Sequence, residues 1–180
     1  MSIDQMNRMI ALASKRSLRD QVLLTLASRH GLRASELAGL RTSDINLKDQ
    51  RILVRSKKGS NTASEALLPG EAELLKRWFA VKPEHALVFP SAKANDSREP
   101  GELTTKQIYR IFRRYAELAG VPDVSRSPHA FRHTLGQHAS RIMDIKAVQV
   151  MLRHKNIQST AQYFTRSQAE VDTAKATLFA

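Results

Sequence analysis

The spacing of apolar residues restricts this chain to a mainly helical fold with one short strand-forming segment. From Leu18 to Ala27, apolar side chains recur every three or four positions, as they do on the buried face of a helix. Ser17 can cap the start of this helix and Gly31 can end it, so about sixteen residues precede the first predicted helix. Patterns of the same kind begin at Glu71, at Thr104 or Thr105, at Ser127, at Asp144 and at Asn156.

The segment from 44 to 68 follows a different period. Its apolar residues alternate with polar ones, which is typical of strands; they are Ile45, Leu47, Ile52 and Val54. The turn 48–50 separates the two pairs, and a third short strand is predicted at 65–68. Residues 56–61, between the second and third strands, predict a polar hairpin that contains a glycine. The expected fold is therefore mainly α with a small three-stranded antiparallel sheet.

The chain carries a large excess of positive charge. Its 180 residues include 29 lysines and arginines against 17 acidic residues, which gives a net charge of +12 and a pI near 10.5. Such an excess attracts polyanions, and nucleic acid is the first partner to expect. No stretch approaches the ~20 apolar residues that span a membrane, and no signal peptide is recognisable, so a cytoplasmic protein is expected. The absence of cysteine excludes disulfides and thiolate metal sites.

Tyr163 and four basic side chains have the chemistry of a phosphate-processing site. A tyrosine hydroxyl has a pKa of ~10 and is a poor nucleophile at neutral pH unless neighbours stabilise its anion or remove its proton. Arg33 and Arg132 can each bind two phosphate oxygens. His129 and His154 can exchange protons near neutral pH. The combination favours phosphoryl transfer through a covalent phosphotyrosine.

Five segments, in this order, resemble the motifs of the tyrosine recombinases, the phage integrase family. They are residues 31–37 around Arg33, residues 57–59 with two lysines, residues 128–134 around Arg132, residues 152–157 around His154, and Tyr163. Together they extend from about Gly31 to Phe164, which is most of the chain. Any one of these motifs occurs by chance, but five in the family's order are hard to produce by accident. The resemblance implies the fold of the family's catalytic domain.

The resemblance also implies a reaction and a role for each matching residue. Members of the family cut a DNA strand when the tyrosine attacks phosphorus, leaving a 3′-phosphotyrosine and a free 5′-hydroxyl, and then join a different strand. Tyr163 matches the nucleophile, and Arg33 and Arg132 match the residues that stabilise charge in the transition state. His129 matches the residue that handles the tyrosine proton, and His154 matches the one that hydrogen-bonds the phosphate.

Further positions complete the comparison with the family. Lys58 matches the general acid that protonates the leaving 5′-oxygen, and Lys57 is the alternative, because the register of the hairpin decides between them. Glu36 is expected to support Arg33 structurally. No metal or cofactor is expected, since the arginines, lysine and imidazoles supply the positive charge that Mg²⁺ brings to other phosphoryl-transfer sites. Arg153 departs from the family, which usually has glycine there, and is expected to add a side chain beside the phosphate pocket.

The length of the chain predicts a single catalytic domain, 1–180, without the N-terminal domain with which most members close around DNA. Two origins fit this length: an excised catalytic domain, or a compact recombinase of the fimbrial phase-variation type. Residues 167–180 have the spacing of an amphipathic helix, which in the family often packs into a neighbouring protomer. The expected partners are double-stranded DNA and further copies of the chain, in a tetrameric synapse at the nucleoid, with no membrane.

Less specific interpretations compete with these roles. Tyr163 could be an ordinary tyrosine at a helix end, as is expected of Tyr109 and Tyr115 on their helix. His133 and His138 are expected in the core or next to the site, because their spacing puts them on different helix faces and does not suit a metal site. Two other function classes fit the chain: a type IB topoisomerase, which rejoins the same strand, and a DNA-binding regulator without catalysis.

Overall fold

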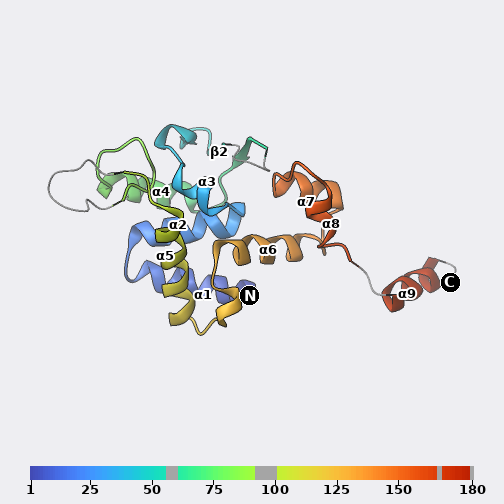
Figure 1. The fold of residues 1–180 in the computed structure, drawn as a ribbon. Helices are drawn as coiled ribbons and strands as arrows, with labels where there is room; N and C mark the ends of the chain where they lie inside the picture. Colours follow the sequence, from blue (N-terminus) through green and yellow to red (C-terminus); the bar gives the residue numbers. More distant parts are fainter. Residues whose placement is uncertain (56–60, 92–100, 166–167, 179–180) are drawn as a thin grey trace.

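The computed structural model describes residues 1–55, 61–91, 101–165 and 168–178, and much of this chain forms a helical body (Figure 1). Helices in this body include α1 (Ile3–Ser14), α2 (Leu18–His30), α4 (Glu71–Val81), α5 (Thr105–Leu118) and α6 (Pro128–Ala139). The second of these, α2, packs against α1, α4 and α6. Every side chain from Val22 to Ser28 is buried, so α2 is the helix around which its neighbours pack.

The N-terminal helix α1 contradicts the expectation that the first helix begins near residue 17. Ser2 starts α1 with a reciprocal cap: its hydroxyl accepts from the Gln5 amide, and the Gln5 side chain accepts from the Ser2 amide. Met6, Met9 and Ala13 are the buried residues of α1, which packs against α2 and α5. Both signals of this helix are visible in the sequence: the Ser-x-x-Gln cap, and apolar residues that recur every three or four positions from Ile3 to Ala13.

The small sheet is antiparallel, as predicted, and has three strands within the described residues. In order across the sheet they are β1 (Ile45–Asn46), β2 (Arg51–Val54) and β3 (Ala63–Ala66). Ile52 pairs with Ile45 on one side and with Glu65 on the other. The third strand begins two residues earlier than predicted, and Leu67 beyond it is buried together with Ile52 and Val54. These apolar side chains attach the sheet to the helical body.

Short connecting elements and capped helix ends surround the motifs that contain Arg33 and Arg132. The connecting elements are α3 (Ala34–Ala38) and the 3-10 helices η1 (Thr42–Asp44) and η2 (Asp123–Ser125). Gly31 ends α2 in the left-handed conformation, with φ of 57°, as its position predicts. Thr104 caps α5 and Ser127 caps α6, whose first residue is Pro128, which confirms both predicted helix starts. Arg33 and Arg132 therefore lie close to well-defined helix ends.

The C-terminal segment contains α7 (Ile145–Met151), α8 (Gln158–Ala161) and α9 (Gln168–Leu178). The helices α7 and α8 pack against each other beside the end of α6 (Figure 1). Tyr163 follows α8, whereas the sequence predicts that it lies within a helix. Figure 1 shows α9 set apart from the body, and its residues 168–177 are exposed. Over the described ranges, no helix has both the length and the apolar character required to cross a bilayer.

Candidate active site

The turn between α2 and α3 holds Arg33 through Glu36. One Glu36 oxygen accepts from the Arg33 amide at 2.9 Å, and the other accepts from Arg33 Nη1 at 3.0 Å. Burial alone would raise the pKa of Glu36, but the hydrogen bond from the Arg33 amide and the charges of Arg153 and Arg33 lower it. Glu36 is thus an anion at neutral pH, and the prediction that it supports Arg33 is confirmed.

Arg132 joins two segments that are far apart in the sequence. It lies in the early part of α6, and its side chain is buried. Its Nη1 donates to the Gly31 carbonyl at 2.6 Å, and its Nη2 donates to the Leu152 carbonyl. Burial and the charges of Arg33 and Arg153 lower the pKa of Arg132 to about 10, so the guanidinium remains charged at neutral pH. Arg132 therefore fixes the backbone two residues before Arg33 and two residues before His154.

Arg33 and Arg132 line one hollow of about 390 Å³. His129 lies exposed at this hollow, on the first turn of α6, with Ser35 and Tyr109 also lining it. The positive end of the α6 dipole adds partial positive charge to that of the two guanidiniums. A hollow with these walls suits an anion such as a phosphodiester.

His154 lies in a buried loop between α7 and α8. Its Nδ1 is 2.9 Å from the Thr160 hydroxyl, which is also buried. Burial and the charges of Arg132 and Arg33 lower the pKa of His154 to about 4, so the ring is neutral at pH 7. When Nδ1 of a neutral imidazole is hydrogen-bonded in this way, Nε2 is available for one further hydrogen bond.

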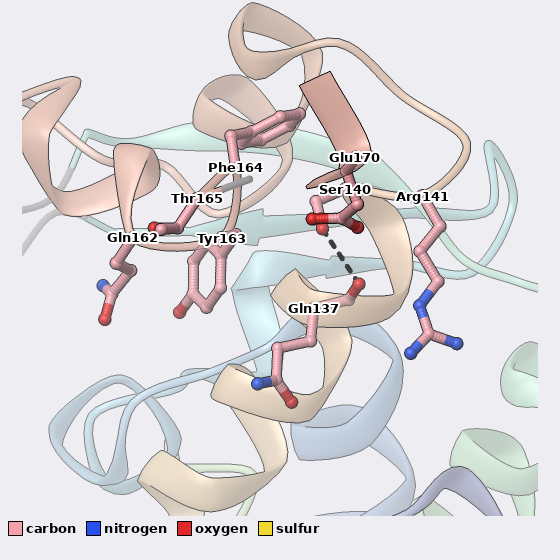
Figure 2. A pocket seen from close by; sticks show the side chains of 8 residues that line it. All are labelled: Gln137, Ser140, Arg141, Gln162, Tyr163, Phe164, Thr165 and Glu170. Atoms are coloured by element: carbon pink, nitrogen blue, oxygen red, sulfur yellow. Dashed lines mark hydrogen bonds between the residues drawn. The ribbon is translucent and has the colours of Figure 1, made fainter. Parts of the chain in front are cut away.

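Tyr163 is half-buried in the turn after α8. Its ring centre lies 5.2 Å from that of His133 on α6. Burial raises the pKa of the Tyr163 hydroxyl, whereas the charges of Arg132 and Arg33 lower it, and the net shift is upward. The hydroxyl is thus protonated at neutral pH and lies within the field of both arginines. Figure 2 shows Tyr163 at a second hollow, of about 440 Å³, that Gln137 also lines.

Gly136 on α6 makes room for the Tyr163 ring. A Cβ atom at position 136 would lie 2.6 Å from Tyr163 Cζ, closer than such atoms approach. A glycine within a helix is unfavourable by roughly 1 kcal/mol relative to alanine, so its presence there requires a packing reason. Gly136 belongs to none of the five motifs, although a glycine inside a helical pattern is a signal that could have identified it.

The remaining predicted residues have mixed outcomes. Lys57 and Lys58 lie outside the described residues. Asn61, the first described residue after them, donates its amide to the Arg153 carbonyl at 3.0 Å. His133 is half-buried beside Tyr163, as expected, but His138 is exposed, because it falls on the outer face of α6. Over the described ranges, no cluster of histidine and acidic side chains could hold a metal ion.

The other two tyrosines differ from Tyr163. Tyr115 is buried and donates to Asp20 at 3.0 Å, so it is a core residue, as predicted. Tyr109 is 45% exposed on the same helix and lines the hollow of Arg33 and Arg132, which the expectation of an ordinary tyrosine did not anticipate. Arg153 does not line that hollow: its side chain is fully buried, which corrects the expectation that it lies beside the phosphate pocket.

Comparison with known proteins agrees with these motifs. Residues 1–170 match the family described as "Phage integrase family". The chain belongs to the tyrosine recombinase, or phage integrase, family. The type 1 fimbriae regulatory protein FimE of Escherichia coli K12 is 33% identical over 152 residues, which are 84% of this chain and 76% of FimE. Tyrosine recombinase XerA of Thermococcus kodakarensis is 28% identical over 171 residues, 93% of this chain and 57% of XerA.

Solved recombinase structures share the fold of this family member. The crystal structure of XerA recombinase superposes with a TM-score of 0.76 at 23% identity, over 98% of this chain and 62% of XerA. XerH recombinase bound to its difH substrate gives a TM-score of 0.78 at 20% identity, over 97% of this chain and 53% of XerH. The mainly helical fold with a small three-stranded antiparallel sheet is thus confirmed as that of a tyrosine-recombinase catalytic domain. This chain spans little more than half of the two solved recombinase chains.

Proposed function

We propose that this protein is a site-specific DNA recombinase that cleaves and rejoins strands through a 3′-phosphotyrosine at Tyr163. The observation that carries the proposal is the convergence of segments distant in sequence: the Tyr163 ring packs against Gly136 on α6, the helix that also carries Arg132. Arg33 and Arg132 line one hollow that suits a phosphodiester. The net charge of +12 supports double-stranded DNA as the substrate.

Arg33 and Arg132 are the proposed stabilisers of the transition state. When the tyrosine oxygen attacks phosphorus, the non-bridging oxygens gain negative charge, and donors that are already in place lower the barrier. Glu36 positions one guanidinium, and two backbone carbonyls position the other. His154 is proposed to donate from Nε2 to the phosphate, while Thr160 binds its Nδ1. These cations and donors provide the charge that a metal ion supplies in other phosphoryl-transfer enzymes, so we propose no metal or cofactor.

Proton transfer is assigned to His129 and to the hairpin lysine. Because burial raises the pKa of Tyr163, its proton must be removed during the attack. His129 is the proposed acceptor; its ring centre lies 6.4 Å from that of His133, which lies 5.2 Å from Tyr163. Lys58, with Lys57 as the alternative, is proposed to protonate the leaving 5′-oxygen.

The active assembly is proposed to be a tetramer on paired DNA sites at the nucleoid in the cytoplasm. Residues 1–180 act as one catalytic domain in this proposal, and the tail helix packs into a neighbouring protomer. The exposure of residues 168–177 supports this exchange, because an amphipathic helix gains stability when its apolar face is covered.

The proposal is tested by trapping the covalent intermediate. The purified protein is incubated with sheared DNA of its host, the protein–DNA adducts are isolated, and mass spectrometry identifies the attached peptide while sequencing identifies the site. We expect the DNA to be attached covalently to Tyr163, and the Tyr163→Phe variant to form no adduct. An adduct that survives this substitution would show that another residue is the nucleophile. Joined products between two copies of the site, rather than relaxed single circles, distinguish a recombinase from a topoisomerase.

A further inference from the structure

A group of buried charged residues lies beneath the site, and the roles proposed above do not use it. It consists of Arg153, Glu36, Glu65, His30 and Glu71. The Arg153 side chain is 0% exposed, and those of Glu36 and Glu71 are 1% exposed. Buried charges are unfavourable unless they are paired and hydrogen-bonded. The ion pairs within this group therefore join the segments of the chain on which these residues lie.

The Arg153 guanidinium joins three segments of the chain. Its Nη1 binds a carboxylate oxygen of Glu65 on β3. Its Nη2 donates to the His30 carbonyl at 2.9 Å and to the Gly31 carbonyl at 3.4 Å, at the end of α2. The same nitrogen lies 3.5 Å from Glu36 on α3. One planar cation thus links the sheet, the turn that precedes Arg33, and the loop that carries His154.

His30 extends these contacts to α4. Its Nδ1 lies 2.8 Å from Glu65, and its Nε2 lies 3.0 Å from Glu71. Burial alone would lower the pKa of His30, but the hydrogen bonds to the two carboxylates raise it to about 9, so the ring is a cation at neutral pH. Glu65 is therefore shared by two cations, His30 and Arg153, and each buried carboxylate has a positively charged partner.

The backbone of Arg153 shows that its side chain is needed at this position. Arg153 has φ of 55°, a left-handed conformation that is unfavourable for a residue with a side chain and accessible to glycine. Glycine is also the residue that the family resemblance leads one to expect here. An arginine in this conformation is retained against its backbone preference by the contacts that its guanidinium makes.

Arg153 and Arg132 hold the same point of the backbone. The Gly31 carbonyl accepts from Arg132 Nη1 at 2.6 Å and lies 3.4 Å from Arg153 Nη2. Glu36 lies between the guanidiniums of Arg33 and Arg153, at 3.0 Å and 3.5 Å. Loss of Arg153 would therefore remove one of the contacts that hold the Glu36 carboxylate and one of those that hold the Gly31 carbonyl, and so loosen the turn that orients Arg33.

We propose that Arg153 is a positioning residue that clamps the Arg33 turn to the His154 loop and to β3, so that the phosphate-binding cations are in place before DNA arrives. The inference rests on the proposed function, because it acts through Arg33. A displacement of 1 Å in a catalytic group can lower a rate by about 10²-fold, so a clamp outside the hollow can control the rate of cleavage.

The test compares Arg153→Gly and Arg153→Lys with the wild type on two DNA substrates. Glycine accepts the backbone conformation at this position, so Arg153→Gly removes the contacts without adding strain. One substrate has the natural phosphodiester; the other has a methylphosphonate at the cleaved position, in which methyl replaces a non-bridging oxygen and removes its negative charge. The rate of adduct formation at Tyr163 is measured with both, and Arg33→Ala is the reference variant.

We expect Arg153→Gly to slow cleavage of the natural substrate by about 10-fold or more, and Arg153→Lys to be intermediate, because one ammonium cannot make all of these contacts. On the methylphosphonate substrate, Arg153→Gly should lose less of its cleavage rate, and so should Arg33→Ala. The transition state on this substrate carries less negative charge, so it depends less on a guanidinium. Leu75→Ala in the core of α4 is the control for lowered stability, and its effect should be the same on both substrates. An equal loss of Arg153→Gly on both substrates, or no loss, overturns the inference.

A double-variant cycle checks the route through Glu36. If Arg153 acts by orienting Glu36 and Arg33, then Arg153→Gly combined with Glu36→Gln should be little slower than the slower single variant. If the rate losses of the two single variants multiply in the double variant, Arg153 and Glu36 act independently, and the inference is overturned. A wild-type chain without an adduct at Tyr163 overturns the proposed function and this inference together, whereas wild-type cleavage with unaffected Arg153 variants overturns only the inference.

Discussion

The buried charged residues around Arg132 and the exposed tail helix α9 differ in how their side chains are covered. Arg132 and Arg153 are buried, and their guanidiniums bind carbonyls and carboxylates of the same chain. In contrast, residues 168–177 of α9 are exposed on a helix that stands apart from the body (Figure 1). The contrast indicates that this chain holds its buried arginines through its own contacts, whereas the tail helix has its side chains available for another surface.

The largest effect is expected from Arg132→Ala. The substitution removes a proposed transition-state donor, which should slow adduct formation by about 10²- to 10³-fold. It also leaves the buried carbonyls of Gly31 and Leu152 without this donor, so the melting temperature should fall. Arg110→Ala, at an exposed arginine of α5, is the matched control and should change neither quantity much. A normal rate for Arg132→Ala would show that the buried guanidinium of Arg132 does not organise the site.

The next largest effect is expected from Gly136→Ala, which adds a methyl group where the Tyr163 ring lies. The ring must move, and cleavage should slow by on the order of 10²-fold while DNA binding persists. Stability should change little, since alanine favours the helix by about 1 kcal/mol and partly offsets the clash. His138→Ala on the exposed face of the same helix is the control. Undiminished cleavage by Gly136→Ala would mean that the active Tyr163 lies elsewhere.

Deletion of residues 168–180 tests the role of the exposed tail helix α9. Because 168–177 are exposed, the deletion should change the free energy of unfolding by less than about 0.5 kcal/mol, and cleavage at a single site should remain. Joining of two sites should be lost, as measured by recombinant product. Val171→Asp should reproduce this loss, and Lys175→Ala, a polar position on the same helix, should not. A large fall in stability would show that the tail packs on its own chain.

The smallest effect is expected from pH, through His30. Its pKa is raised from 6.5 to about 9 by Glu65 and Glu71, despite burial. A raised pKa means that the stabilisation is fully present below pH 6.5 and is lost as the pH rises through 9. The melting temperature of the wild type should therefore fall between pH 6.5 and 9, and His30→Gln should flatten this dependence. Equal slopes for both proteins would exclude a charged His30 between the carboxylates.

Much of the fold could be predicted because its signals are local. Ser17, Thr104 and Ser127 cap helices as their side chains suggest, and Gly31 ends α2. The exception is α1, which the prediction left out although the sequence carries both its cap at Ser2 and apolar residues at helical spacing. The sequence motifs predicted Arg33, Arg132, His154 and Tyr163 as site residues. The structure places Arg33 and Arg132 at one hollow. The lysine of the hairpin and the roles of all these residues stay predictions.

What the sequence by itself determined is most of the helices, the family and the chemical types available for the reaction, because caps, periodicity and motifs depend on residues that are close together in the chain. Only the tertiary structure showed that Arg153 turns into the core and that Gly136 makes room for the Tyr163 ring. Those two facts depend on contacts between residues that are 27 to more than 100 positions apart. Such contacts arise when helices pack, since a side chain's direction and burial are decided by what lies against it.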